Sequence, residues 1–360
     1  MSKRLSIEEG IRLLTEAPLE ELRERAVALR NARNPPKRVT FVLDSNPNYT
    51  NLCNADCSFC AFYRHSGAKD AYQKNLEESL EHVALAAEAG CSTVMFQGGL
   101  ADYPLSFYTS LVRETLSRYP TIYPHYFTAP EIWNCARVNN LSIRDVLEAL
   151  YDAGQRSLPG GGAEILTERV RTQISPKKMA PGAWIEIHKT AHQIGMRSTA
   201  TMMYGHVEEA RDIVEHLDTL RSAQDEIPGF TAFIPWSYKR ERTALRRKVK
   251  HWAGLDVYLR ILAFSRIYLD NFDHIQFSPI FEGLEGQKAI HYGADDAGGI
   301  VLEENVHRAT GFNLFKARAD EMIGWIRSAG YEPAERNPLY EILRTFENYQ
   351  APERNPLALA

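Results

Sequence analysis

The fold is decided by one stretch, residues 48–64, which reads NYTNLCNADCSFCAFYR. It places Cys53, Cys57 and Cys60 in a CxxxCxxC pattern just after a predicted β-strand. Three thiolates can hold three irons of a 4Fe–4S cluster and leave the fourth iron without a protein ligand. A metal with an open coordination position can bind and activate a small molecule. The pattern therefore predicts a catalytic iron–sulfur centre.

Two other interpretations of these cysteines stay open. A structural zinc ion usually has four ligands in paired CxxC spacing, and here only His65 could be the fourth. Cysteines without a metal usually sit singly in a core, as we expect for Cys91 and Cys135. A non-enzymatic iron–sulfur or zinc-binding scaffold is the alternative class of protein.

Composition and charge narrow the class further. The chain has 360 residues, a net charge of −4 and a pI of about 6.3, whereas nucleic-acid-binding proteins usually carry a basic surplus. No apolar stretch approaches the roughly 18 residues of a membrane span, and the N-terminus lacks the apolar region of a secretory signal. Five cysteines, an odd number, argue against a secreted disulfide framework. We therefore expect a cytoplasmic protein with no nucleic-acid or membrane partner.

Strand and helix signals alternate from residue 37 onward and predict about eight β/α units. The predicted strands are Val39–Leu43, Thr93–Phe96, Ile122–Phe127, Ser157–Leu158, Thr199–Tyr204, Phe230–Trp236, His274–Ile280 and Ile300–Glu303. Such alternation gives a parallel sheet covered by helices, and the glycine-rich and polar loops after the strands favour a (β/α)8 TIM-type barrel. We expect a helical extension at 1–36, the barrel at 37–311 and a C-terminal helix and tail at 312–360.

Several stretches resemble one branch of the radical S-adenosylmethionine (SAM) superfamily, the futalosine-pathway enzymes of menaquinone biosynthesis. The deazaflavin (FO) synthases are related to the same branch. The resemblance spans about residues 37 to 311 and rests on the cysteine loop, Thr128–Ile132, Pro159–Leu166, Ala200–Glu208, Gly229–Trp236 and Glu303–Val306. It implies a 4Fe–4S cluster on the three cysteines, SAM bound at the open iron, and a flavodoxin- or ferredoxin-type reductant.

Within this branch, four stretches are similar to the dehypoxanthine futalosine cyclases: Cys60–Arg64, Ser198–Met203, Pro235-Trp236 and Glu303–Val306. This resemblance implies that a ribose hydrogen is removed and a ring is closed. The predicted helix at Glu186–His192 is closer to aminofutalosine synthase, so radical addition to an enolpyruvyl alkene stays open.

Two loops depart from the cyclase pattern and leave the exact substrate open: Lys239–Thr243 and Ser278–Gly283. The first lies after a predicted strand, where a barrel has its catalytic mouth. Because arginine pairs well with carboxylates, we predict that Arg240 and Arg242 bind the benzoate group of a futalosine-type substrate. A solvated run of charges is the other interpretation.

Residues near the cysteines are predicted to contact SAM. Phe59 and Tyr63 accompany the cysteine motif, and Gln97–Gly99 follows a predicted strand. The glycines of this second loop, Gly98 and Gly99, let backbone approach a ligand closely. The resemblance implies that Gln97, Gly98 and Gly99 receive the SAM amine. Glu164 is predicted to bind the SAM ribose or amine, or else to serve as a carboxylate at a helix N-terminus.

Tyr204 and His206 end a predicted strand on the face where barrel chemistry occurs. Ring closure onto an arene requires the loss of a proton, and either residue could accept it, although helix capping or packing explains both equally well. His188 and His192 stand at i and i+4 on a predicted helix. Lys189 occupies the position of the glutamate in a zinc-binding HExxH motif, which disfavours a metal there.

Overall fold

The computed structural model describes residues 4–249, 252–278, 282–313 and 318–346. Its elements in chain order are α1 (Ile7–Glu16), α2 (Leu19–Arg33), β1 (Arg38–Asn46), α3 (Leu76–Glu88), β2 (Thr93–Val94), α4 (Leu105–Arg118), β3 (Tyr123–Pro124), α5 (Ala129–Asn139), α6 (Ile143–Ala153), β4 (Ser157–Leu158), α7 (Glu168–Ile174), α8 (Pro181–Ile194), β5 (Arg197–Tyr204), α9 (Ala210–Glu226), β6 (Phe230–Ser237), the 3-10 helix η1 (Leu245–Arg247), α10 (Leu255–Tyr268), β7 (His274–Ile275), the 3-10 helix η2 (Leu284–His291), β8 (Asp296–Glu304), α12 (Asn305–Ala309), α13 (Ala319–Ser328), β9 (Glu332–Arg336) and β10 (Ile342–Thr345). Residues 279–281 of one predicted strand and the start of the helix predicted at 314–329 lie outside the described residues.

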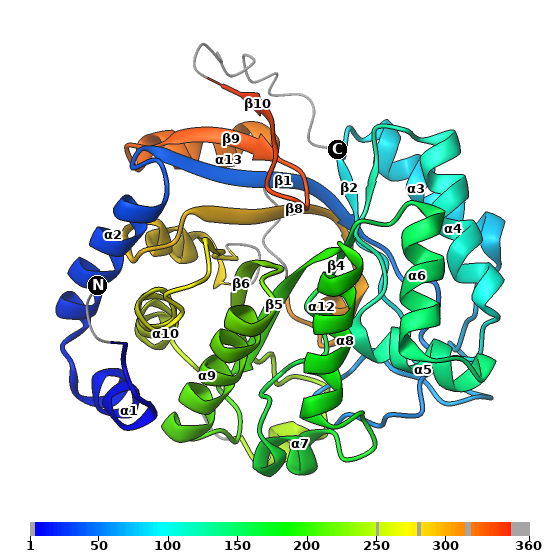
Figure 1. Cartoon of the computed structure of the whole chain (residues 1–360), viewed down its shortest axis with the longest axis horizontal. Coiled ribbons are helices and arrows are strands. Elements are labelled where there is room, and N and C mark those ends of the chain that lie inside the picture. Colours follow the sequence, from blue (N-terminus) through cyan, green and yellow to red (C-terminus); the bar gives the residue numbers. More distant parts are fainter. Residues whose placement is uncertain (1–3, 250–251, 279–281, 314–317, 347–360) are drawn as a thin grey trace.

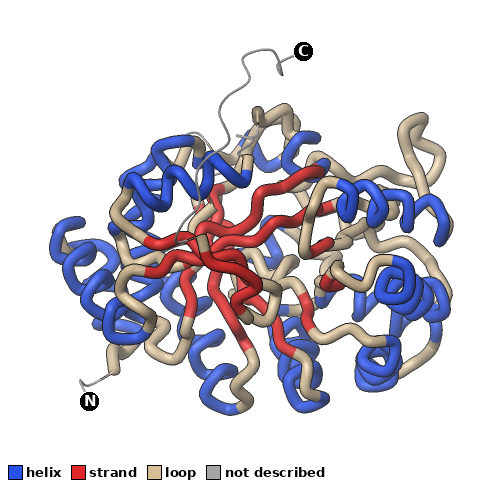
Figure 2. The backbone as a smooth tube through the Cα atoms, turned by 90° about the horizontal axis from the view of Figure 1, so that it is seen from above, coloured by secondary structure: helices blue, strands red, loops and turns tan. Residues whose placement is uncertain are grey.

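Strands β1 to β8 gather at the centre of the molecule, with helices around them (Figure 1; Figure 2). β1 pairs in parallel with both β2 and β8, which brings the last barrel strand back to the first. Parallel ladders also join β2 to β3, β4 to β5, β5 to β6 and β6 to β7. A single parallel bridge between Gln276 and Asp296 links β7 to β8. The α/β barrel predicted from the sequence is confirmed.

Among the described strands, a single bridge rather than a ladder joins β7 to β8, and the seam between β3 and β4 has no backbone pairing. Side chains span this seam instead. His125 Nδ1 lies 2.8 Å from Ser157 Oγ, and Gln155 Nε2 donates to the Tyr126 carbonyl at 2.7 Å. The sheet is therefore curled and closed at β8–β1, and it is joined by side chains at β3–β4.

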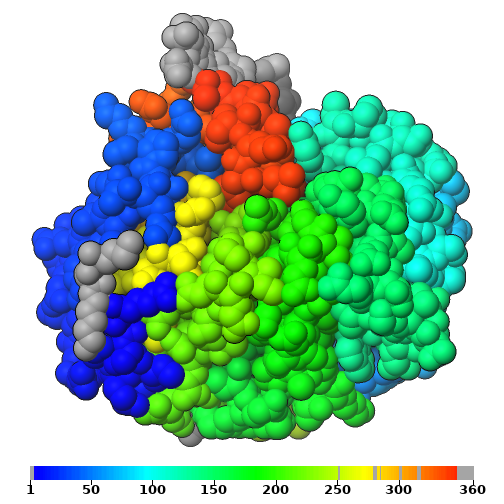
Figure 3. Space-filling view, in the orientation of Figure 1, coloured from blue at the N-terminus to red at the C-terminus, as the bar shows by residue number. Residues whose placement is uncertain are grey.

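The C-terminal segment adds strand β9 to this sheet. β9 pairs with Arg38–Phe41 in the first half of β1, whereas β2 pairs with Asp44 and Ser45 in the second half. Arg336 at the end of β9 donates to both carboxylate oxygens of Asp296 at 2.8 and 2.9 Å. In Figure 3 the red C-terminal residues lie beside blue residues of the N-terminal part. The predicted domain boundaries stay a prediction, but β9 contributes directly to the barrel.

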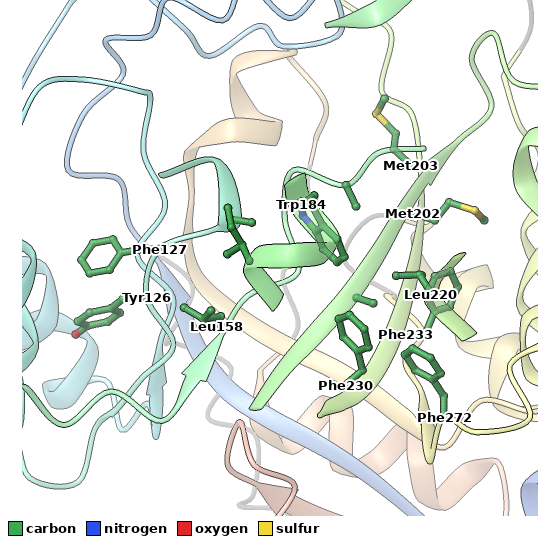
Figure 4. Packing of buried hydrophobic residues seen from close by; sticks show 14 of the residues in the cluster. Tyr126, Phe127, Leu158, Trp184, Met202, Met203, Leu220, Phe230, Phe233 and Phe272 are labelled. Carbon is green, nitrogen blue, oxygen red and sulfur yellow. The ribbon is translucent and has the colours of Figure 1, made fainter. Parts of the chain in front are cut away.

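The core lies between the strands and the surrounding helices, and Figure 4 shows part of it around β5 and β6. Phe230 stacks on Trp184 of α8 with ring centroids 6.0 Å apart and on Phe272 at 5.5 Å. The two cysteines predicted to be core residues, Cys91 and Cys135, are both buried. The Trp184–Phe230 stack thus packs α8 against β6.

His188 and His192 belong to this core as well. The His188 Nδ1 and the His192 Nε2 lie 2.9 and 2.7 Å from the same Ser198 hydroxyl oxygen. Burial lowers the pKa of both imidazoles, that of His192 to about 4. The pair therefore packs α8 onto β5 in the neutral form, in agreement with the low expectation of a metal there.

The N-terminal extension is helical as predicted, and Ser6 and Glu9 form a capping box at the start of α1. α1 packs on α9, and α2 packs on α10. The helices α5 and α7 and the strands β9 and β10 were not predicted from the sequence. None of the helices in the described ranges is long and apolar enough to cross a membrane.

Candidate active site

The cysteine loop follows β1 and is held by hydrogen bonds at both of its ends. The Arg64 guanidinium donates to the three carbonyls of Ala61–Tyr63 at 2.9 to 3.1 Å and to Asp70 at 2.7 Å. Ser58 donates from its amide and its hydroxyl to the Ile174 carbonyl at 2.7 and 3.0 Å. These contacts fix the backbone between them, so that the three thiols face one pocket.

Cys53, Cys57 and Cys60 line a pocket of about 150 Å³, the cysteine pocket. Burial raises the pKa of the Cys57 thiol to about 12 and raises that of Cys60 too. Such thiols become thiolates when a metal compensates their charge. In the described part of the chain, no three His, Cys, Asp or Glu side chains gather tightly enough to hold one metal ion. A cluster offers each thiolate an iron of its own, so the donor set fits a 4Fe–4S cluster.

The Gln97–Gly99 loop packs against the cysteine loop at a distance that only glycine allows. A Cβ on Gly99 would lie 2.1 Å from the Leu52 carbonyl oxygen, and a Cβ on Gly98 would lie 2.8 Å from the Tyr49 ring. Any larger residue would push the two loops apart. The glycines are therefore required by packing, whether or not a ligand touches them.

Glu131 on α5 holds this glycine loop in place. Its Oε1 accepts from the Gly98 amide at 2.9 Å and from the Tyr49 hydroxyl at 2.6 Å, and its Oε2 accepts from the Thr128 amide at 2.8 Å. Burial raises the pKa of the Glu131 carboxyl to about 7. This role was not predicted, although a Thr followed three residues later by Glu is the signal of a capping box.

Glu164 lines the cysteine pocket and lies between two cations. Its carboxylate accepts from Arg171 Nη1 at 2.8 Å and from Lys178 Nζ at 3.0 Å. Burial alone would raise the pKa of Glu164, but the charges of Lys178 and Arg171 outweigh it and lower that pKa. Its backbone φ of +46° is rare for a residue other than glycine, which is typical of functional positions. A fixed, ionised carboxylate thus faces the pocket.

In the structure, all the residues predicted to contact SAM line the same pocket. Phe59, Tyr63, the Gln97–Gly99 loop and Glu164 all line the cysteine pocket. Their individual contacts with SAM stay a prediction. Lys178 lines the same pocket and was not predicted, because a single lysine in a polar loop carries no sequence signal.

A second cavity, of about 270 Å³, fills the barrel interior next to the cysteine pocket. The two spaces share Phe59, Gln97, Gly162, Glu164 and Val306 in their linings. Alternate residues of four strands form much of the remaining lining: Val42, Asp44, Asn46, Thr93, Met95, Thr199, Thr201, Ile234 and Trp236. A reactive species formed at the cluster would therefore adjoin a ligand held in this barrel cavity.

Tyr204 and His206 line neither of these two spaces. On β5 the cavity-lining residues are Thr199 and Thr201, so the alternation of side chains turns Tyr204 outward, where it is buried. His206 Nε2 lies 2.9 Å from the Met203 carbonyl oxygen, and its Nδ1 accepts from the next backbone amide at 2.8 Å. Both ring nitrogens of His206 are thus occupied, and Tyr204 points away from the cavity. The geometry therefore gives neither residue support as a proton acceptor.

Arg240 and Arg242 also lie outside both linings. Arg242 is exposed and Arg240 is half-buried. Lys239, at the start of the same basic run, is buried, and burial lowers its pKa. Among the described residues, the arginine that lines the barrel cavity is Arg336 of β9. The geometry therefore gives the predicted benzoate contact no support.

Two sequence families match the chain. The Radical SAM superfamily matches residues 47–220, and the CofH/MqnC C-terminal region matches residues 227–349. The chain is also 38% identical to the cyclic dehypoxanthine futalosine synthase of Halalkalibacterium halodurans over 98% of its own length and 95% of that protein. The chain belongs to the radical SAM superfamily. As a radical SAM enzyme it uses a 4Fe–4S cluster and SAM.

Other relatives of this radical SAM enzyme match at similar identity. It is 35% identical to the aminodeoxyfutalosine synthase of Thermus thermophilus, over 97% of this chain and 95% of that one. It is also 35% identical to a 5-amino-6-(D-ribitylamino)uracil–L-tyrosine 4-hydroxyphenyl transferase of Methanopyrus kandleri, over 86% of each chain. Identity alone therefore separates these activities poorly.

Solved structures of more distant proteins share the fold. Methylornithine synthase (PylB) superposes with a TM-score of 0.70 at 15% identity, over 92% of this chain and 95% of that chain. The hydrogenase maturase HydG from Carboxydothermus hydrogenoformans gives 0.72 at 14% identity, over 94% and 78%. At such identities the likeness shows the barrel alone.

Proposed function

We propose that this radical SAM enzyme converts dehypoxanthine futalosine to cyclic dehypoxanthine futalosine, a step of menaquinone biosynthesis. The observation that carries the proposal is the 38% identity over 98% of the chain to an enzyme of that name. The barrel cavity next to the cysteine pocket supports it, because it can enclose a small molecule beside the cluster. Cys53, Cys57 and Cys60 would hold the cluster, which with bound SAM would supply the radical chemistry that removes a hydrogen atom from the substrate ribose.

The protein's own contribution is to hold, orient and enclose the reactants. The three cysteines hold three irons of the cluster, and Asn48 Nδ2 donates to the Gln97 carbonyl at 2.8 Å, which fixes the glycine loop beside them. Ring closure would join ribose C4′ to an arene carbon, and the arene would then regain aromaticity by giving a proton to solvent and an electron to a one-electron acceptor such as the oxidised cluster. A cavity inside the barrel limits the access of water and keeps the reacting atoms in place for this bond.

The second candidate is an aminofutalosine-type synthase, which the 35% identity over 97% of the chain favours. The two activities differ in the fate of the adenosyl group. A cyclase releases free 5′-deoxyadenosine, whereas addition to an enolpyruvyl alkene builds the adenosyl group into the product.

Anaerobic reconstitution with iron and sulfide, followed by mass spectrometry of the products, tests the proposal. Dehypoxanthine futalosine should give the cyclic product and an equal amount of 5′-deoxyadenosine, and the enolpyruvyl substrate should stay unconverted. Cys57→Ala protein, treated in the same way, is the control for chemistry that does not need the cluster. Conversion of the enolpyruvyl substrate alone would reject the cyclase in favour of the synthase.

We also propose a cytoplasmic site of action and a flavodoxin- or ferredoxin-type reductant. All five cysteines are free thiols, which a reducing compartment preserves. The cluster takes up a single electron, and small flavin or iron–sulfur proteins are one-electron donors. Turnover with reduced flavodoxin or ferredoxin should match turnover with a chemical reductant; support by neither protein would reject this part.

A further inference from the structure

Among the described residues, three side chains on the neighbouring strands β1 and β2 line the barrel cavity with a polar atom that has no hydrogen-bond partner. The atoms are Asp44 Oδ1, Asn46 Oδ1 and Thr93 Oγ1. The three residues are only 8%, 5% and 4% exposed. Each unsatisfied buried group costs roughly 1–3 kcal/mol, so native proteins rarely keep several together unless something binds them.

The three residues lie side by side on one face of the sheet. Asp44 and Asn46 are two residues apart on β1, and therefore point to the same side. Thr93 of β2 pairs in register with Asp44. Since neighbouring strands lie about 4.8 Å apart, their side chains form a continuous row along the cavity wall.

The direction of the Asn46 amide is set by its neighbour Glu304. The Asn46 Nδ2 donates to the Glu304 carboxylate, which also accepts from the backbone amides of Val306 and His307 at 2.9 and 3.0 Å. A carboxylate only accepts, so the NH₂ group must face it. The unpartnered atom of Asn46 is therefore a carbonyl oxygen, a hydrogen-bond acceptor.

The Asp44 carboxylate occupies a space that Gly299 of β8 leaves open. A Cβ on Gly299 would lie 2.1 and 2.3 Å from the two Asp44 oxygens. The row thus presents a carboxylate oxygen, an amide oxygen and a hydroxyl. The Asn46 oxygen and the ionised form of the Asp44 carboxyl only accept hydrogen bonds, so a complementary ligand must donate hydrogen bonds to them and must not be an anion at this point.

We infer that Asp44, Asn46 and Thr93 form a subsite for the hydroxyl groups of a sugar ring, and that this ring is the ribose of the substrate. The inference rests on the proposed function and deepens it, because dehypoxanthine futalosine carries a ribose whose hydroxyls are free to donate. SAM also contains a ribose. The three residues line the barrel cavity and not the cysteine pocket, which favours the substrate as the source.

The test measures binding of each ligand to reconstituted enzyme. Thr93→Val removes a hydroxyl while keeping the side-chain shape, and Asp44→Asn replaces a charged acceptor by an amide. Calorimetry gives the Kd for dehypoxanthine futalosine without SAM, and the EPR change of the reduced cluster gives the Kd for SAM. We expect the substrate Kd to rise about fivefold in Thr93→Val and at least about tenfold in Asp44→Asn, as loss of one hydrogen bond predicts. The SAM Kd should stay within about twofold.

Thr231→Val is the matched control, because Thr231 lies on β6 outside the cavity lining and already donates to the Ser198 carbonyl at 3.1 Å. It should leave both dissociation constants unchanged. If Asp44→Asn fails to take up the cluster, the shape-conserving Thr93→Val decides.

Each remaining outcome has one meaning. Weaker SAM binding with unchanged substrate binding would assign the row to the SAM ribose and overturn the inference. Unchanged binding of both ligands in both variants would show that the row holds water only, and would overturn it too. If the wild-type enzyme binds the ribose compound without converting it and both variants lose that binding, the subsite stands and the proposed cyclase activity fails.

Discussion

The cysteine pocket and the barrel cavity share a wall, yet they are built differently. In the pocket, side chains such as Arg64 and Glu131 hold the backbone of the two loops through several hydrogen bonds each. In the cavity, Asp44 and Thr93 have polar atoms without a partner. Most of the first arrangement is held by the protein's own hydrogen bonds, whereas we infer that the second is completed by a ligand. Substitutions in the pocket should therefore remove cofactor binding, and substitutions in the cavity should change substrate binding alone.

The largest effect is expected from the cluster ligands. Cys53→Ala, Cys57→Ala and Cys60→Ala should each abolish SAM cleavage and reduce iron well below the roughly four atoms per chain of a cuboidal cluster. Cys91→Ala, in the core away from the pocket, should retain both iron and activity. Iron analysis and 5′-deoxyadenosine release measure the difference. A fully active Cys57→Ala enzyme would remove the cluster assignment.

The cysteine pocket could be predicted because its signal is local. Cys53, Cys57 and Cys60 are close in sequence, and the glycines of Gln97–Gly99 stand directly after a strand. Such spacing constrains geometry whatever the rest of the fold does. The support from Glu131 was not predicted, because it joins residues 33 positions apart and depends on how α5 meets the loop.

The barrel cavity was harder to predict, because both faces of a parallel barrel strand are buried. Hydrophobic alternation then does not show which residues point inward. The prediction of Tyr204 rests on its place at the end of a strand. In the structure Thr199 and Thr201 of β5 line the cavity, so the alternation of side chains turns Tyr204 away from it. The sequence signal that marks this cavity wall is Asp44, an acidic residue inside the apolar strand β1.

Strand β9 could not be predicted from the sequence for a third reason. Its sequence, Glu332–Arg336, contains a proline and three charged residues and has no strand propensity. It forms a strand because Arg38–Phe41 of β1 has a free edge there and because Arg336 pairs with Asp296. Only the tertiary structure provides either partner.

The next effect in size is expected from the contact between the two loops of the cysteine pocket. Gly99→Ala would place a Cβ 2.1 Å from the Leu52 carbonyl and should separate the loops. We expect SAM binding to weaken about a hundredfold, because backbone rather than a flexible side chain has to move. Gly182→Ala is the matched control, since a Cβ there meets nothing within 4 Å. Equal SAM affinity in the two variants would contradict this account of the pocket.

A smaller effect, on stability, is expected from Asp44. Burial raises the pKa of its carboxyl to about 7, opposed by Arg336 and reinforced by Glu304 and Asp296. The unfolded chain has a pKa of about 3.9 at this residue and releases the proton first as pH rises. The wild-type free energy of unfolding therefore falls between about pH 4 and pH 7 on account of this group, and then levels off.

Asp44→Asn does not titrate at this position. Its free energy of unfolding relative to wild type should be higher at pH 8 than at pH 5 by roughly 1–3 kcal/mol. Urea unfolding of both proteins at the two pH values measures it. Glu285→Gln, at an exposed site, should show no such difference. The same difference between Asp44→Asn and wild type at both pH values would mean that the unpartnered carboxylate is not desolvated, and the contrast between pocket and cavity would weaken.

The smallest effect is expected in the basic loop. Arg240 and Arg242 lie outside the lining of both spaces, and Arg242 is exposed, so neither is placed to touch a ligand in the barrel cavity. Removal of an exposed charge usually changes free energies by about 0.5 kcal/mol or less, which corresponds to about a twofold change in kcat/KM. Arg240→Ala and Arg242→Ala should therefore behave like Arg246→Ala and Arg247→Ala, with intact cluster and SAM binding in all four. A charge-assisted contact with the substrate carboxylate would instead be worth roughly 1.5–3 kcal/mol, or a ten- to hundredfold loss in kcat/KM. Such a loss in the first pair alone would mean that the loop moves over the cavity when substrate binds, and that the closed enzyme recognises the benzoate from the loop while the strands hold the ribose.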